Sequence, residues 1–233
     1  MPVVSGTAAL VVTIVGLVGV NLWVQVGPSR WQPVTGPVLA VLLLLLGRSA
    51  GLSWEQLGLG AGTIVSGLAW GGVAVRVVAA VYAVGLAAPA TRRLFLDARH
   101  RVGTGRAARR ALIAVPLGVV VLEEVAFRGV LWGLVEVEHG ATWATAVSSV
   151  LFGLWHVLPA ADGARANAEG GPVGRGVVVR QVAGTVAFTT GAGVVFAVLR
   201  HESGSLLAPF LLHWATNGLG ILAAAWAWTV RRD

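Results

Sequence analysis

The chain has 233 residues, of which 56% are hydrophobic and only 12% are charged, and its mean hydropathy is +0.80. A soluble domain of this length usually carries about twice that fraction of charged residues, so the composition excludes an ordinary soluble fold. The absence of cysteine excludes disulfide and thiolate chemistry.

Seven apolar segments follow one another along the chain, and several approach or exceed the roughly 20 residues that cross a hydrocarbon core. They cover residues 7–26, 34–47, 63–88, 111–135, 141–158, 177–199 and 206–230. The first lacks the basic start and cleavage site of a signal peptide and should remain as a helix. We therefore predict an all-α, polytopic bundle of about seven transmembrane helices, forming a single membrane domain over residues 1–233.

All 17 basic residues of the chain are arginines. A pI near 11.6 would indicate nucleic acid as the partner of a soluble protein. Here most arginines lie between apolar segments, where they set orientation and contact anionic lipid, so we expect the bilayer and no nucleic acid as partner.

The arginine distribution predicts the orientation. With the loop between the third and fourth segments in the cytoplasm, 13 arginines fall on that side and only Arg48 and Arg200 on the other. The N-terminus is then outside and the C-terminus inside. The turn at residues 136–140 falls outside, and residues 159–176 form a mobile connection. The 13 cytoplasmic arginines are Arg30, Arg92, Arg93, Arg99, Arg101, Arg106, Arg109, Arg110, Arg165, Arg175, Arg180, Arg231 and Arg232.

The fourth segment contains three ionisable residues, Glu123, Glu124 and Arg128. Placing an ionisable side chain in a membrane costs free energy, so each of the three is expected to have a structural or functional role. Glu124 and Arg128 are four residues apart with the acid first, which favours an intrahelical ion pair. Glu123 lies about 100° around the helix from Glu124, so it is the carboxylate left free to act. A purely structural ion-pair network is the alternative.

Two later constellations favour a functional interpretation. His156 ends the fifth segment, while His213 and Asn217 lie one helical turn apart in the seventh. A glutamate and two histidines can activate water in two ways. They can hold a divalent metal, usually zinc, with Glu123, His156 and His213 as ligands. Alternatively, Glu123 acts as a general base while the histidines and Asn217 stabilise an oxyanion, or Asn217 orients His213.

The order EExxxR, FxxxH, HxxxN resembles the CPBP family, which comprises CAAX prenyl proteases and bacteriocin-processing or immunity proteins and is also called the Abi family. The motifs are Glu123-Glu124 with Arg128, Phe152 with His156, and His213 with Asn217. The resemblance covers residues 111–221, which we expect to form the catalytic core, and is looser over residues 1–90.

The resemblance implies an intramembrane endopeptidase of the type II CAAX kind. In such enzymes the first glutamate, here Glu123, activates the attacking water. His156, His213 and Asn217 would complete the site, and Glu124 and Arg128 would support it. The resemblance leaves open whether zinc is a cofactor. The arginine-, alanine- and glycine-rich composition is typical of a bacterium with a high-GC genome. The expected substrate is then a peptide or membrane protein at the bacterial cytoplasmic membrane.

Two other functions stay open at this point. One is a catalytically silent protein of the same fold that acts in bacteriocin immunity or partner binding. The other is a proton-coupled transporter, which also uses buried glutamate and histidine. For the enzyme we expect a water-filled cavity that leads from the cytoplasm to Glu123.

Overall fold

Helices account for nearly all of the described chain in the computed structural model, which covers residues 3–26, 31–166 and 174–231. Two of the arginines counted above, Arg30 and Arg232, lie outside these ranges. The long helices are α1 (Gly6–Val26), α2 (Gln32–Ser49), α3 (Ile64–Ala87), α7 (Trp132–Trp155), α8 (Val157–Ala166), α9 (Arg175–Ser203), α10 (Leu207–Trp214) and α11 (Gly220–Val230). The described residues form no strand, so the predicted all-α class is confirmed.

Shorter helical pieces connect them. These are η2 (Ala61–Thr63), α4 (Pro89–Arg92), η3 (Arg93–Phe95), η4 (Ala98–His100), α5 (Thr104–Arg109), η5 (Arg110–Ala114), η6 (Pro116–Val120), α6 (Val121–Glu124), η7 (Val125–Leu131) and η8 (Ala215–Leu219). The pieces η5, η6, η7 and η8 are wide π-helical turns. Such turns often occur at functional sites.

All seven apolar segments lie on helices. Four helices within the described residues are long and apolar enough to cross a membrane: Gly6–Trp23, Ala61–Ala87, Arg175–Ser203 and Leu207–Val230. The second segment corresponds to a shorter apolar helix, Pro33–Ser49. The fourth and fifth segments form a hairpin, because α7 breaks at Gly140, where φ is +80° and ψ is 168°. That backbone conformation is essentially restricted to glycine.

One expectation about the connections is wrong. Residues 159–176 were expected to be a mobile connection, but Val157–Ala166 form helix α8. The high helix propensity of its alanines outweighs the low propensity of Gly163. Pro159 lies in the first turn, where a helix tolerates proline. Residues 167–173 lie outside the described part of the chain.

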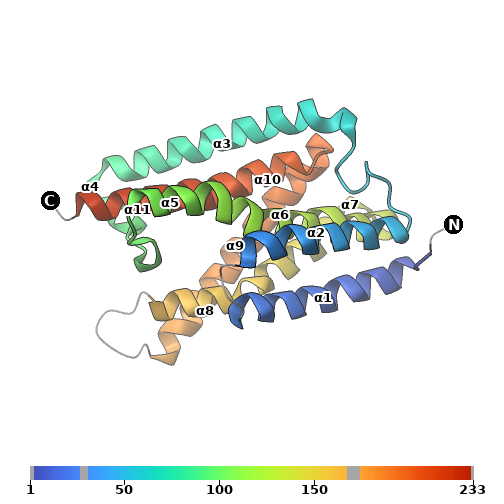
Figure 1. The fold of residues 1–233 in the computed structure, drawn as a ribbon, viewed down its shortest axis with the longest axis horizontal. Coiled ribbons are helices and arrows are strands. Elements are labelled where there is room, and N and C mark those ends of the chain that lie inside the picture. The colour runs from blue at the N-terminus through green and yellow to red at the C-terminus, as the bar shows by residue number, and fades with distance from the viewer. Residues whose placement is uncertain (1–2, 27–30, 167–173, 232–233) are drawn as a thin grey trace.

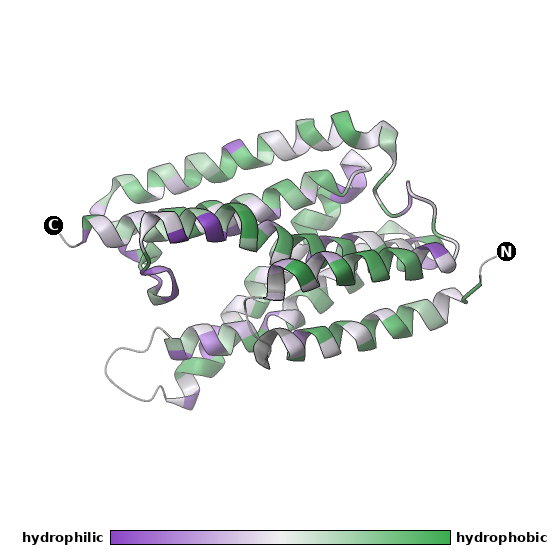
Figure 2. Ribbon diagram, viewed as in Figure 1, coloured by the Kyte–Doolittle hydropathy of each residue, from purple (hydrophilic) through white to green (hydrophobic). Residues whose placement is uncertain are grey.

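The connections gather at two ends of the bundle (Figure 1). At one end the start of α1, the α2–α3 connection and the α9–α10 connection meet, with backbone hydrogen bonds from Val3 to Ser49 and from Leu206 to Gly58. At the other end lie α4, α5, α8 and the end of α11. Hydrophilic residues are prominent at this second end, while the helices between the ends are largely hydrophobic (Figure 2).

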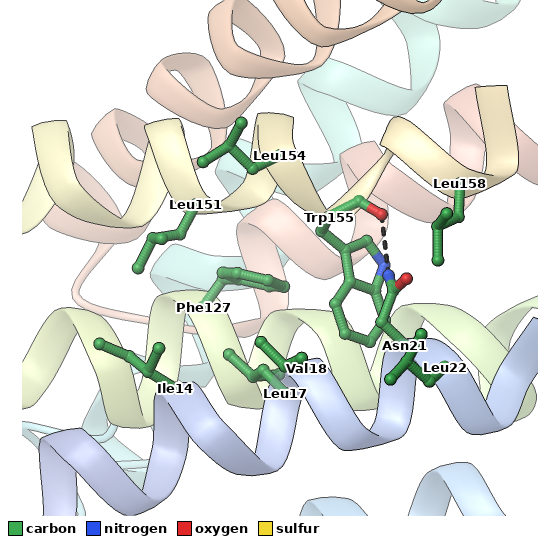
Figure 3. A pocket seen from close by; sticks show the side chains of 10 residues that line it. All are labelled: Ile14, Leu17, Val18, Asn21, Leu22, Phe127, Leu151, Leu154, Trp155 and Leu158. Atoms are coloured by element: carbon green, nitrogen blue, oxygen red, sulfur yellow. Dashed lines mark hydrogen bonds between the residues drawn. The ribbon is translucent and has the colours of Figure 1, made fainter. Parts of the chain in front are cut away.

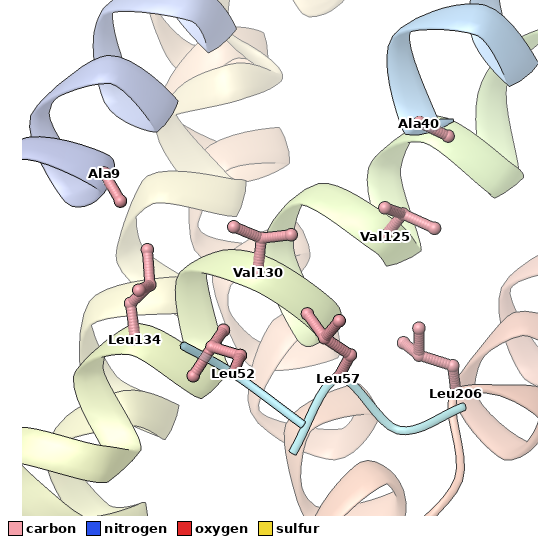
Figure 4. Close-up of a cluster of buried hydrophobic side chains, with 8 residues drawn as sticks. All are labelled: Ala9, Ala40, Leu52, Leu57, Val125, Val130, Leu134 and Leu206. Carbon is pink, nitrogen blue, oxygen red and sulfur yellow. The ribbon is translucent and has the colours of Figure 1, made fainter. Parts of the chain in front are cut away.

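The core is centred on η7, all seven residues of which are buried. One face of η7 packs into an aliphatic cluster formed by α1, α2, the α2–α3 connection and the start of α10 (Figure 4). Its members are Ala9, Ala40, Leu52, Leu57, Val125, Val130, Leu134 and Leu206. Another face packs on Phe152 and Phe196, from α7 and α9. This packing fixes the adjacent α6, which carries Glu123 and Glu124.

Candidate active site

Glu124 binds two side chains at the centre of the bundle. Its Oε1 atom lies 3.2 Å from Arg128 Nη1 and 2.7 Å from His213 Nδ1. The three residues are between 0% and 3% exposed. The predicted ion pair between Glu124 and Arg128 is therefore confirmed. Glu124, and not Asn217, is the residue that orients His213, since no hydrogen bond joins Asn217 to His213 in the described structure.

Arg128 lies among aromatic rings. Its Cζ atom is 4.0 Å from the ring centre of Phe152 and 4.8 Å from that of Phe196. Its Nη2 donates a hydrogen bond of 3.5 Å to the Gly193 carbonyl. A guanidinium over aromatic faces gains cation–π attraction that is strongest where water is excluded. These contacts, together with Glu124, offset the desolvation of the buried cation.

Phe152 explains why the second motif begins with an aromatic residue. Besides Arg128, its ring contacts His156 edge-on at 4.6 Å and His213 at 5.7 Å, between ring centres. Phe196, from α9, stacks on the other side of the site against His213 at 5.0 Å. The Phe152 ring thus touches one residue from each of the three motifs and fixes their relative positions.

Glu123 has one oxygen fixed and one free. Oε1 accepts a hydrogen bond of 2.9 Å from the indole Nε1 of Trp155. Oε2 has no hydrogen-bond partner among the described residues and lies 3.7 Å from His213 Nε2. Because a buried carboxylate oxygen without a partner is costly, a site that leaves one in place is suited to binding a ligand or a water.

A cavity of about 350 Å³ reaches Glu123 from the arginine-rich end of the bundle. Its wall also includes His156 from the end of α7, Arg99 from η4 and Asp162 from α8. The His156 Nδ1 lies 2.7 Å from the Phe152 carbonyl oxygen. Since a carbonyl only accepts, Nδ1 carries the proton, and Nε2 of the neutral ring is an acceptor.

His156 also borders a cavity of about 600 Å³ together with His213 and Asn217. Asn217 lies on the wide turn η8, half-buried, with no hydrogen bond to its side chain among the described residues. Tyr82 donates a 2.8 Å hydrogen bond to the carbonyl of the preceding Thr216 and so supports η8 from α3. The six site residues are thus brought together: four by direct contact, and His156 and Asn217 through shared cavity walls.

The predicted metal ligands are not gathered into a metal site. A zinc ion needs three or four donors at about 2 Å from a common point. No group of three His, Asp or Glu side chains in the described ranges meets that requirement. The Nδ1 atoms of His213 and His156 face Glu124 and a backbone carbonyl, which leaves Nε2 as the ring nitrogen through which either histidine could bind a metal.

The sequence interpretation missed Trp155 and Asn21. Asn21 of α1 donates a 2.8 Å hydrogen bond to the Trp155 carbonyl, at the edge of an apolar cavity of about 310 Å³ between α1 and α7 (Figure 3). Two signals could have identified them. Trp155 directly precedes the motif histidine, and Asn21 places an amide in an apolar span, where polar groups usually have a partner.

Comparison with known proteins gives one match. Residues 107–219 match the family model described as type II CAAX prenyl endopeptidase, Rce1-like. No curated protein and no solved structure shows a significant match to the chain. The four apolar helices and this match describe a multi-pass membrane protein related to proteases. In agreement with the CPBP resemblance, the stretch of the chain that carries the three motifs, residues 107–219, is similar to the Rce1-like family of type II CAAX prenyl endopeptidases.

Proposed function

We propose that the protein is an intramembrane endopeptidase in which Glu123 is the general base. The observation that carries this proposal is the state of its carboxylate: Trp155 fixes Oε1, Oε2 has no hydrogen-bond partner among the described residues, and Glu123 lines a cavity. A general base must be held in place and still be free to accept a proton.

The proposed reaction is hydrolysis of a peptide bond. Glu123 takes a proton from water, the hydroxide adds to the carbonyl carbon, and the carbon–nitrogen bond breaks as Glu123 returns that proton to the leaving amine. The Asn217 side-chain amide is proposed to donate a hydrogen bond to the carbonyl oxygen as it becomes negative. His156 and His213 border the same cavity as Asn217, and His213 is held by Glu124.

The proposed substrate is a peptide or a membrane protein in the bacterial cytoplasmic membrane, and residues 111–221 are proposed to be the catalytic core. Access from the arginine-rich end is supported by the cavity that joins Arg99 to Glu123. With the proposed N-terminus-out orientation, this end faces the cytoplasm. Cleavage would then take place at or below the cytoplasmic membrane surface.

Cleavage of a peptide library by the purified protein in liposomes tests this function. We expect Glu123→Gln to reduce cleavage by about 10² or more, because the base is lost while the shape is kept. Glu202→Gln, at an exposed position near the end of α9, is the matched control and should cleave like the wild type. Equal cleavage by wild type and Glu123→Gln would contradict the proposal. Proton-dependent uptake lost in Glu123→Gln would instead indicate a transporter.

A further inference from the structure

A cavity of about 830 Å³ opens at the arginine-rich end of the bundle and continues to the site. His156 and Asn217 form part of its wall, and four arginines form another part. Asp97 is the one acidic residue in the described wall, so the cavity carries an excess of positive charge. The arginines are Arg93, Arg99, Arg101 and Arg231.

Among the described residues, Asp97 pairs with Arg99. Its carboxylate lies 2.6 Å from Arg99 Nη2 and also accepts hydrogen bonds from the Arg99 backbone and Nε. Partial burial would raise the pKa of Asp97, but the hydrogen bonds from Arg99 lower it to about 2. Asp97 is therefore ionised at neutral pH and paired with Arg99. It also shows that this wall accommodates a carboxylate.

The other three arginines are available. The side chains of Arg93, Arg101 and Arg231 are exposed, and none has a side-chain hydrogen bond or ion pair within the described ranges. A lone arginine on a membrane protein usually contacts headgroups or water. Three unpaired guanidinium groups on one cavity wall raise the local concentration of anions more than separate ones would.

Trp228 of α11 organises two of them. The Cζ atoms of Arg101 and Arg231 lie 5.0 Å and 5.3 Å from the centre of its ring. Its indole Nε1 donates a 2.9 Å hydrogen bond to the Asp97 carbonyl and so ties the arginine-bearing loop to α11. Stacking engages the flat face of a guanidinium and leaves its N–H edge free for two parallel hydrogen bonds to a carboxylate.

We propose that this cavity is a subsite for a carboxylate of the substrate peptide, either an acidic side chain or a free C-terminal carboxylate. Arg101 and Arg231 bind the carboxylate with Arg93 nearby, while the adjoining chain extends along α8 and α9 toward His156 and Asn217. This subsite deepens the proposed function and rests on it. A peptide suits the cavity better than a lipid headgroup does, because the wall continues from the arginines inward to the site.

Peptide binding by the full-length Glu123→Gln protein tests the subsite without cleavage. The protein is placed in neutral phosphatidylcholine nanodiscs, and binding is followed by fluorescence polarisation. Three apolar decapeptides with an uncharged dye share one sequence. The first carries Asp-Glu and an amidated end, the second carries Asn-Gln and a free carboxylate, and the third carries Asn-Gln and an amidated end. We expect one or both acidic peptides to bind about tenfold more tightly than the neutral one.

Variants of the arginines locate the effect. Arg101→Gln combined with Arg231→Gln should reduce the preference to about threefold or less. Arg109→Gln, at an exposed position of α5 outside the described cavity wall, removes one positive charge and should retain the preference. Raising the salt to about 0.5 M should weaken it, because these groups are exposed.

Several outcomes would overturn the subsite. These are equal binding of the three peptides, a preference that survives in the double variant, and an equal loss in Arg109→Gln. Loss of the preference in phosphatidylglycerol nanodiscs at matched ionic strength would assign the arginines to lipid headgroups instead. Wild-type cleavage is measured separately, so an active protease without the preference refutes the subsite alone, and a preference without cleavage refutes the protease alone.

Discussion

At the scale of single residues, the indole N–H of Trp155 is expected to position the Glu123 carboxylate. Its indole N–H binds Glu123 Oε1, and its position is fixed by the Asn21 hydrogen bond to its carbonyl. Trp155→Phe keeps an aromatic ring but removes the donor. A hydrogen bond to a charged group contributes about 1.5–3 kcal/mol, so we expect kcat of the proposed peptidase to fall about tenfold or more.

The control for Trp155→Phe is Trp143→Phe, since Trp143 is 64% exposed on the same helix and lies away from the site. It should leave kcat unchanged. Thermal unfolding in detergent should show that both variants stay folded. Unchanged kcat in folded Trp155→Phe would mean that Glu123 needs no positioning by the indole.

We expect Glu124 to stabilise the site rather than to react. It is 1% exposed and holds both Arg128 and His213. Glu124→Gln leaves the guanidinium buried without its counter-charge, which typically costs about 3–5 kcal/mol. We therefore expect a clear fall in the unfolding temperature. Arg128→Met added to Glu124→Gln removes the orphaned charge and should recover part of the loss. A double variant no more stable than Glu124→Gln would show that aromatic contacts, and not charge balance, set the stability there.

Only some of the contacts at the site could be predicted from the sequence. The four-residue spacing predicted the contact between Glu124 and Arg128, because helical geometry alone brings them together. It could not predict that Glu124 also holds His213, since that contact depends on the packing of α10 against α6. The role of Trp155 was missed for the same reason. The spacing predicted that Glu123 is not part of the intrahelical ion pair, but the indole that binds its Oε1 comes from a tertiary contact.

At the scale of elements, hydropathy identified the helices better than the connections. Every apolar segment is helical because a backbone in lipid must satisfy its own hydrogen bonds. Helix α8 was missed because its Pro, Gly and Asp residues resemble a loop, although it contributes Pro159 and Asp162 to the cavity at Glu123. The wide turns η7 and η8 have no sequence signal that distinguishes them from ordinary helix.

The α2–α3 connection depends on a glycine. Gly58 has φ +76°, and a Cβ there would collide with Arg200, which donates hydrogen bonds to the Glu55 and Gln56 carbonyls. Gly58→Ala should therefore lower stability by about 1–3 kcal/mol, measured by thermal unfolding in detergent. Gly62→Ala is the matched control, because no atom lies within 4 Å of a Cβ there, and it should be nearly neutral. Equal stability of both variants would show that this connection can rearrange.

At the scale of the whole molecule, burial is the reverse of that in a soluble protein. Large apolar side chains such as Val65, Val84 and Phe188 are more than 70% exposed, whereas Glu123, Glu124 and Arg128 are at most 5% exposed. An exterior of this kind is stable only in contact with lipid. Lipid around the bundle also excludes water from the ion pairs at its centre, which strengthens them.

Cysteine labelling at the two ends of the bundle tests the membrane orientation that the arginine distribution predicts. Gly105 is exposed at the arginine-rich end, and His139 is exposed beside the break in α7. Since the chain has no native cysteine, Gly105→Cys and His139→Cys each provide a unique label site. With the basic end held in the cytoplasm, a membrane-impermeant maleimide should label His139→Cys in intact cells and Gly105→Cys only after lysis. The opposite pattern would place the arginine cavity outside, where an intracellular peptide could not reach Glu123 through it.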